Sequence, residues 1–209
     1  MKIMRKLGYL FIMIGIAILL SNGYAWWDQA QAVTYDPDKI QQQHEDWKEI
    51  TAKKTINPIV SEKETVKTEE IKTYQTGKHV GKLAIPRIGS AYDVYWGADP
   101  NTLKKGVGMY ESKWTVSPNQ KGHVVLSGHR DTVFRNLKDM NKGDHLYFTY
   151  EETTYNYQVR KIWITDKDDR SVIVKKSTPT LTLTTCYPFD YLGSAPDRYI
   201  IQAELISKE

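Results

Sequence analysis

The sequence predicts a mainly β protein whose short strands form a closed antiparallel barrel or a sandwich, preceded by a transmembrane helix and a polar stalk. Three observations support this fold class: an N-terminal apolar stretch, a polar segment after it, and then short alternating segments separated by turn signals. Short strands with regular turns are typical of barrels and sandwiches. We divide the 209 residues into an anchor (1–27), a stalk (28–77) and a β domain (78–209).

The N-terminal stretch has the length and the flanks of a membrane anchor. Basic residues occur within 2–6, and residues 7–27 carry no charge. A helix needs ~20 residues to cross a bilayer. Because a basic flank tends to stay in the cytoplasm, we expect a single-pass anchor in the cell membrane with the β domain outside. Trp26 and Trp27 would lie at the outer interface.

A cleaved signal peptide is the alternative interpretation of this stretch. Gly23 and Ala25 are small residues at the spacing that a signal peptidase uses. The length of the apolar run favours an uncleaved anchor. Both interpretations place the β domain outside the cytoplasm.

The predicted stalk is polar and poor in aromatic residues. Asp36 and Pro37 form a helix start, with proline at the first helical position. One face of that helix would carry Ile40, His44, Trp47 and Ile50, and it would either dock on the β domain or fray. Ser61–Thr76 is rich in Lys, Glu and Thr, as in a flexible tether. We expect a spacer; the alternative is a segment that covers the functional site.

Short segments with strand character make up the β domain. They are Lys82–Pro86, Asp93–Trp96, His123–Leu126, His145–Tyr150, Thr154–Thr165, Thr180–Thr185 and Arg198–Leu205. Turn signals such as Asp99-Pro100-Asn101 and Lys142-Gly143-Asp144 separate them. Residues 103–105 and 132–140 are predicted as short helices, the second capped by Asp131 or Thr132.

The composition argues against several classes of function. The net charge is +4 and the sequence pI is about 8.9, and no basic stripe with interleaved aromatic residues is present. Nucleic acid is therefore not an expected partner. A single cysteine excludes an intrachain disulfide, and no Cys/His cluster has the spacing of a zinc site.

The only cysteine lies at the end of a predicted strand. Leucine and threonine alternate over residues 180–185, which indicates a strand with one buried face that leads to Cys186. Pro188 cannot donate to a ladder, so the strand should end close to the thiol. His129 follows an apolar run, and Arg198 begins another strand-like segment. All three side chains are thus predicted at strand ends.

These three residue types can perform nucleophilic catalysis together. A thiol needs a base or a cation to become a nucleophilic thiolate, and a tetrahedral adduct needs a donor for its oxyanion. We assign Cys186 as the nucleophile, His129 as the general acid and base, and Arg198 as the oxyanion donor. Taken singly, each has a structural interpretation: a small buried hydrophobe, a hydrogen-bonded histidine and a surface charge.

Two segments resemble the signature blocks of the sortases, membrane-anchored cysteine transpeptidases of Gram-positive bacteria. These are LSGHRDTVFRNL (126–137) and TLTTCYPFDYLGSAPDRYII (182–201). GKLAIPRIG (81–89) and LKKGVGMYESKW (103–114) resemble further family blocks, so the likeness covers about residues 78–209. The chain looks most like class D of the bacilli. It departs from its relatives at Asp93, where they often carry proline.

The resemblance implies an eight-stranded sortase-type β-barrel in which His129, Cys186 and Arg198 are the catalytic residues. It also implies that the loop from Asp166 to Pro179 helps to bind the substrate. From that loop we predict Ile173 and Val174 as substrate-binding residues. Next to the catalytic residues, we predict Thr185 and Asp131 for the same role.

The implied reaction cleaves a Leu-Pro-x-Thr-type sorting signal of a surface protein through a thioester. The acyl group then passes to an amine of a peptidoglycan precursor, and no cofactor is needed. One alternative is another exported cysteine peptidase or transpeptidase. An L,D-transpeptidase usually shows Ser-x-Gly-Cys-x-Arg, which TTCYP lacks. The other alternative is a non-enzymatic, membrane-tethered β-barrel that binds a partner and leaves Cys186 unreactive.

Overall fold

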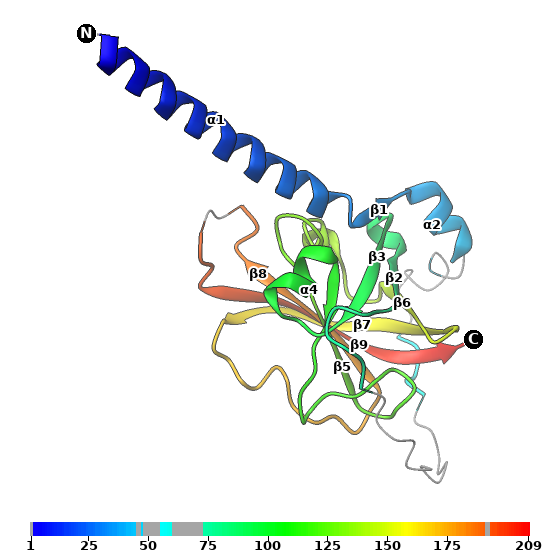
Figure 1. Ribbon diagram of the computed structural model, residues 1–209. Helices are drawn as coiled ribbons and strands as arrows, with labels where there is room; N and C mark the ends of the chain where they lie inside the picture. Colours follow the sequence, from blue (N-terminus) through cyan, green and yellow to red (C-terminus); the bar gives the residue numbers. More distant parts are fainter. Residues whose placement is uncertain (1, 45–46, 48–54, 60–72, 191–192) are drawn as a thin grey trace.

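A β-barrel with one long projecting helix makes up the computed structural model (Figure 1). The structure describes the chain except for residues 1, 45–46, 48–54, 60–72 and 191–192. Helix α1 (Lys2–Ala30) leaves the barrel close to strand β1 (Val33–Tyr35), as Figure 1 shows.

Eight strands close into the barrel that the sequence implied. They are β2 (His79–Ile85), β3 (Ser90–Trp96), β4 (Val107–Met109), β5 (His123–Ser127), β6 (His145–Tyr150), β7 (Thr153–Asp166), β8 (Thr180–Tyr187) and β9 (Asp197–Lys208). Their order is β3-β2-β6-β7-β9-β8-β5-β4, and a parallel β3–β4 pairing closes the sheet. The predicted strand segments overlap β2, β3 and β5 to β9.

The two strands that the prediction missed, β1 and β4, share one edge of β3. β4 pairs with the second half of β3, from Val94 to Trp96. β1 pairs antiparallel with the first half, where Val33 lies opposite Tyr92. An uncovered strand edge presents unpaired backbone groups to solvent and to other chains. β1 therefore covers the part of the β3 edge that the short β4 leaves open.

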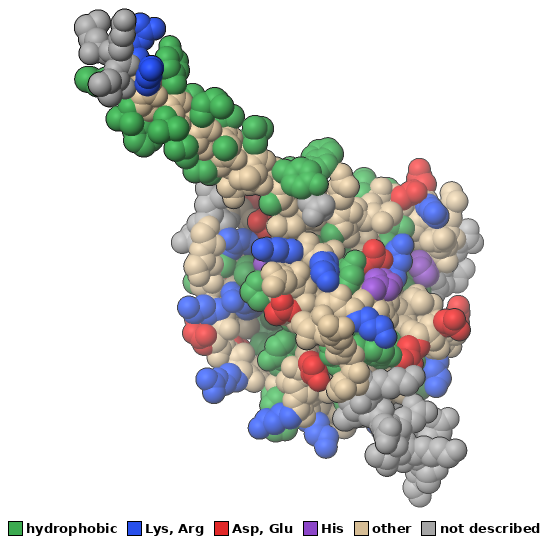
Figure 2. All heavy atoms as spheres, viewed as in Figure 1, with side chains coloured by type: hydrophobic (Ala, Val, Ile, Leu, Met, Phe, Trp, Pro, Cys, Tyr) green, Lys and Arg blue, Asp and Glu red, His purple; other side chains and the backbone are tan. Residues whose placement is uncertain are grey.

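Helix α1 has the composition of a membrane-crossing segment. Met4–Trp27 has a mean hydropathy of 1.8, and none of it is buried against the barrel. Figure 2 shows hydrophobic side chains along this helix, whereas the barrel surface mixes basic and acidic groups. An apolar helix that contacts no protein core suits a lipid environment, although a signal sequence has the same character.

The start of the predicted stalk packs on the barrel as helix α2 (Pro37–Gln43). Asp36 caps this helix, because its Oδ1 accepts a hydrogen bond of 3.1 Å from the Lys39 N–H. Ile40 is buried, and the His44 ring stacks on Tyr147 with centroids 3.9 Å apart. Ile40 and His44 of the predicted apolar face thus dock on the barrel, and α2 itself ends at Gln43.

The rest of the predicted stalk is only partly described. Ile50 and residues 60–72 lie outside the described residues, so the tether proposed for Ser61–Thr76 stays a prediction, as does the division into anchor, stalk and domain. Helix α2 packs against β3 and the short 3₁₀ helix η1 (Pro86–Ile88). Cys186 is on a different strand, β8, so these contacts of the stalk do not involve the strand that carries the thiol.

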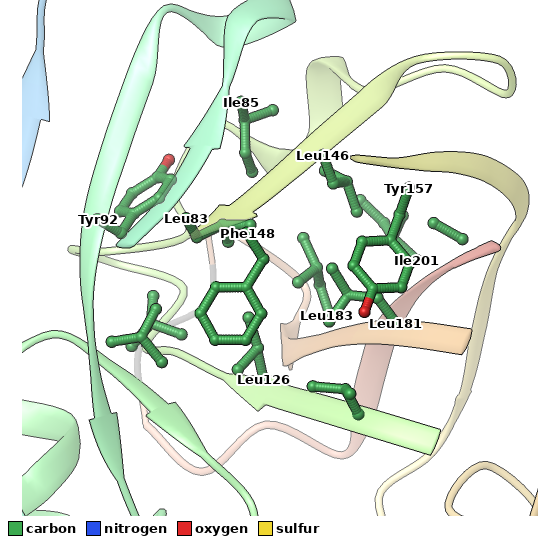
Figure 3. Packing of buried hydrophobic residues seen from close by; sticks show 14 of the residues in the cluster. Leu83, Ile85, Tyr92, Leu126, Leu146, Phe148, Tyr157, Leu181, Leu183 and Ile201 are labelled. Carbon is green, nitrogen blue, oxygen red and sulfur yellow. The ribbon is translucent and has the colours of Figure 1, made fainter. Parts of the chain in front are cut away.

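Side chains from all sides of the barrel meet in one core. Figure 3 shows Leu83 and Phe148 from β2 and β6 facing Leu126 and Leu183 from β5 and β8. All four are fully buried. Because strand residues alternate between faces, the inward leucines of β8 fix which of its other side chains point outward.

The predicted helix 132–140 was wrong, whereas the one at 103–105 is part of α4 (Pro100–Lys105), capped by Asp99. Turns over residues 131–136 lead into a 3₁₀ helix, η2 (Leu137–Asp139). Val133 and Phe134 are both buried in the core. Two successive side chains that must both reach the core, one of them β-branched, favour a tight turn over a regular helix.

Candidate active site

Cys186 and Arg198 lie directly opposite each other on neighbouring strands. β8 and β9 are antiparallel, and their register pairs Cys186 with Arg198. Opposite residues of such a pair project to the same face, with Cβ atoms about 4.5–5.5 Å apart. The thiol and the guanidinium therefore share one face of the sheet, although Arg198 is 12 positions further along the chain.

That face is the outside of the barrel. Leu181 and Leu183 point into the core and are fully buried. The alternation of β8 then turns Thr182, Thr184 and Cys186 outward. Cys186 is half-buried, so its sulfur is sheltered without being enclosed in the core.

His129 approaches the same place from β5. β5 and β8 are parallel, and their last paired residues are Ser127 and Thr184. The Gly128 N–H still donates to the Thr184 carbonyl at 3.2 Å. Continued by two residues, this register puts His129 level with Cys186. The topology thus brings the three predicted catalytic residues to adjacent strand ends.

Local contacts explain why His129 follows a glycine. A Cβ on Gly128 would lie 2.7 Å from the Phe134 ring, so a larger residue would displace this segment. The Phe134 N–H in turn donates to the His129 carbonyl at 2.8 Å. The backbone of His129 is therefore held by β8 on one side and by the core-packed turn on the other.

Arg130, which the sequence reasoning did not single out, is buried beside the predicted catalytic residue His129. Its side chain is 8% exposed, and its Nη2 donates to the Gly193 carbonyl at 2.8 Å. Gly193 lies in the loop between β8 and β9, so Arg130 ties that loop to the segment of His129. Its position beside His129 in the Gly-His-Arg-Asp sequence was the available signal.

Arg198 is half-buried, and backbone carbonyls hold its side chain. Nη1 donates to the Asp197 oxygen at 3.0 Å and to the Ala195 oxygen at 3.4 Å. A guanidinium has five N–H donors in a planar fork. Among the described residues both contacts use one nitrogen, so the fork keeps donors on Nε and Nη2 for a carbonyl or an oxyanion.

Thr185 and Asp131, which were predicted to bind substrate, lie in different environments. Thr185 is 3% exposed, and its hydroxyl donates to the Gly128 carbonyl at 2.8 Å. This contact links β8 to the segment before His129. Asp131 is exposed, and it has no regular helix to cap because turns follow it. A substrate contact for either residue stays a prediction.

Ile173 and Val174 are half-buried in the loop between β7 and β8. Asp169 shapes the start of this loop, because its carboxylate accepts hydrogen bonds from the Ser171 N–H and the Thr165 hydroxyl. Hydrogen bonds from Ser171 and Thr165 also lower the pKa of Asp169. Further along the loop, the Val174 carbonyl oxygen lies 2.8 Å from His123 Nδ1.

Within the described residues, no group of three or more His, Cys, Asp or Glu side chains could hold a metal ion. The three predicted catalytic residues can perform a different chemistry. The Cys186 thiol can attack, the His129 imidazole can transfer a proton, and the Arg198 guanidinium can stabilise a negative oxygen.

Comparisons with known proteins identify relatives of this chain. The family model of the sortase domain matches residues 83–206. Sortase D of Bacillus subtilis is 42% identical over 134 residues, which cover 64% of this chain and 67% of that protein. The match to Sortase A of Listeria monocytogenes, at 29% identity, covers 65% of this chain and 60% of that protein.

Solved structures give the same result. The catalytic domain of B. anthracis SrtD is 54% identical, with a TM-score of 0.58, over 66% of this chain and 93% of that one. Sortase A of Listeria monocytogenes is 28% identical, with a TM-score of 0.57, over 63% of this chain and 90% of that one.

Proposed function

Because the chain belongs to the sortase family of transpeptidases, we propose that it cleaves a Leu-Pro-x-Thr-type sorting signal after the threonine and joins the new end to a peptidoglycan amine. The observation that carries this proposal is the pairing of Cys186 with Arg198 on the outer face of β8 and β9. His129 is two residues beyond the last β5–β8 pair.

Each residue has one role in the first half of the reaction. The Cys186 sulfur, whose proton passes to His129, attacks the threonine carbonyl carbon, and the carbonyl oxygen becomes an oxyanion that Arg198 stabilises by hydrogen bonds. As the adduct collapses, the C–N bond breaks and His129 gives a proton to the leaving amine. The product of this half is a thioester between the peptide and Cys186.

The second half reverses the proton transfer. An amine attacks the thioester carbonyl, and His129 takes its proton. The C–S bond breaks, the Cys186 sulfur leaves, and a new amide forms. The oxyanion of this second adduct needs the same donor, so Arg198 acts in both halves.

Product analysis tests this function. The full-length chain in detergent, a Leu-Pro-x-Thr peptide and an amine such as diaminopimelate are expected to give a product in which the peptide through threonine is joined to the amine by an amide bond, with the mass of the two components less one water. Hydrolysis alone, with every amine tried, would favour a peptidase. If the peptide stays intact and an alkylating reagent does not label the thiol of the folded protein, the binding-module alternative is favoured instead.

We also propose that α1 is an uncleaved anchor and that the barrel lies outside the cell membrane. The apolar helix Met4–Trp27 and its basic N-terminal flank support this topology. Fractionation of cells that express the chain is expected to leave it in the membrane fraction at full length, accessible to protease from outside. A soluble, shortened product that begins at Trp26 would identify a signal peptide instead.

A further inference from the structure

A buried histidine that the proposed mechanism does not use lies beneath the loop between β7 and β8. His123 is the first residue of β5 and is fully buried. Its Nδ1 lies 2.8 Å from the Val174 carbonyl oxygen, and its Nε2 lies 2.7 Å from Thr182 Oγ1. The imidazole therefore links the loop, through Val174, to strand β8.

The partners of this imidazole define which ring nitrogen carries the proton, and its surroundings define its charge. A carbonyl oxygen only accepts, so Nδ1 carries the proton and donates it to Val174. Nε2 then accepts from the Thr182 hydroxyl, whose oxygen also accepts from Gln202 Nε2 at 3.3 Å. Burial lowers the pKa of His123 and the charge of Lys176 lowers it further, while the hydrogen bond to Val174 opposes them. The link is thus an uncharged imidazole at neutral pH.

The loop covers part of the face of the sheet on which the thiol lies, at Thr182. Thr182 and Ile200 point outward from β8 and β9, as Cys186 does. Both are nonetheless buried, with exposed fractions of 0% and 1%. Side chains outside the barrel are buried only where another segment covers them. Val172 of the loop is also buried, and His123 holds the next part of the loop over Thr182.

The stretch of this face between the thiol and the covered Thr182 has about the length of a short peptide. Thr182 and Cys186 are four residues apart, which is about 13 Å along a strand. A four-residue peptide in an extended conformation has about the same length. A sorting peptide that extended along the outer face of β8 from its scissile carbonyl at Cys186 would therefore meet the loop that covers Thr182, at Ile173 and Val174, with its upstream end.

We propose that His123 is a positioning residue for substrate binding, because it fixes the segment of Ile173 and Val174 at the upstream end of the bound peptide. This inference rests on the proposed transpeptidase function. His123 is on the first rung of the β5–β8 ladder, whereas Ser127, two residues before His129, is on the last. His123 therefore acts through the loop and does not touch the reacting atoms.

Two substitutions separate the contributions of the two ring nitrogens. His123→Asn keeps an amide N–H near the position of Nδ1, where it can still donate to Val174. His123→Gln places its amide near the position of Nε2 and loses the Val174 contact. For the Gln variant of the full-length chain in detergent, we expect the KM for a sorting peptide to rise roughly 3- to 10-fold, as for one lost hydrogen bond, with kcat within about twofold.

The Asn variant is expected to keep KM within about twofold of the unmodified chain. His145→Gln is the matched control for His123→Gln, since His145 is also buried but lies on β6, where its Nδ1 contacts Asn156. This control should lower thermal stability without raising KM. Equal rises in KM for the Asn and Gln variants, no rise in either, or a loss confined to kcat would each contradict the proposal.

Hydrogen exchange tests the loop contact without any reaction. Amides of residues 170–176 are expected to exchange faster in His123→Gln than in His123→Asn. If the unmodified chain turned over no peptide, the proposed function would fail, and this exchange difference would still support the role of His123 in holding the loop. Equal exchange in the two variants would contradict that role, even in an active enzyme.

Discussion

Cys186→Ala is expected to abolish both cleavage of the sorting peptide and its transfer to an amine. Cys186 is the only thiol in the chain, so no other side chain can form the thioester. Loss of a nucleophile that acts as a unit with its base typically lowers kcat by roughly 10⁴- to 10⁶-fold. The measurement is product formation by mass spectrometry under conditions where a rate 10⁴-fold below that of the unmodified chain, about 5.4 kcal/mol, is still detectable.

The Cys186→Ala variant should fold normally. Cys186 is half-buried at the end of β8, and the substitution removes a single heavy atom outside the core. The thermal unfolding midpoint and the circular dichroism spectrum are therefore expected to stay close to those of the unmodified chain. A folded Cys186→Ala variant that still joined peptide to amine would show that the nucleophile lies elsewhere.

Arg198→Lys is expected to lose most of the catalytic rate although it keeps the positive charge. A guanidinium presents parallel donors in a rigid fork, whereas an ammonium is a point charge on a flexible stem. Removal of an oxyanion donor typically lowers kcat by about 100- to 1000-fold, or about 2.7–4 kcal/mol. Because the oxyanion exists only in the transition state and the adduct, the loss should appear in kcat rather than in KM.

Steady-state kinetics of Arg198→Lys and Arg198→Ala against a sorting peptide check this expectation. Arg135→Lys is the matched control, because Arg135 is an exposed arginine and should tolerate the change. A rise in KM with kcat unchanged would restrict Arg198 to binding of the substrate. A kcat close to that of the unmodified chain in both Arg198 variants would remove it from the catalytic set.

The long strands could be predicted from the sequence because their side chains alternate. β8 has leucines at 181 and 183 between threonines, and this pattern placed Cys186 at a strand end. β1 and β4 have three residues each, too few for an alternation, and they form because the edge of β3 is available to them. A strand that tertiary pairing imposes leaves little local signal.

The arrangement of the site depended on pairing between distant segments. Cys186 and Arg198 meet through the register of β8 and β9. His129 follows β5, and the parallel pairing of β5 with β8 brings it to them. Sequence spacing does not fix a register, so only the family resemblance could suggest their proximity. His123 was missed for a related reason: its partners Val174 and Thr182 are 51 and 59 positions away.

The thioester itself gives the most direct test of the proposal that Cys186 is the nucleophile. The full-length chain, mixed with a Leu-Pro-x-Thr peptide and quenched in acid, is analysed by intact-protein and peptide mass spectrometry. We expect an adduct of the peptide through threonine on Cys186, which hydroxylamine releases and an added amine converts to the joined product. Turnover of the peptide with no adduct on Cys186, or with an adduct on another residue, would contradict the account.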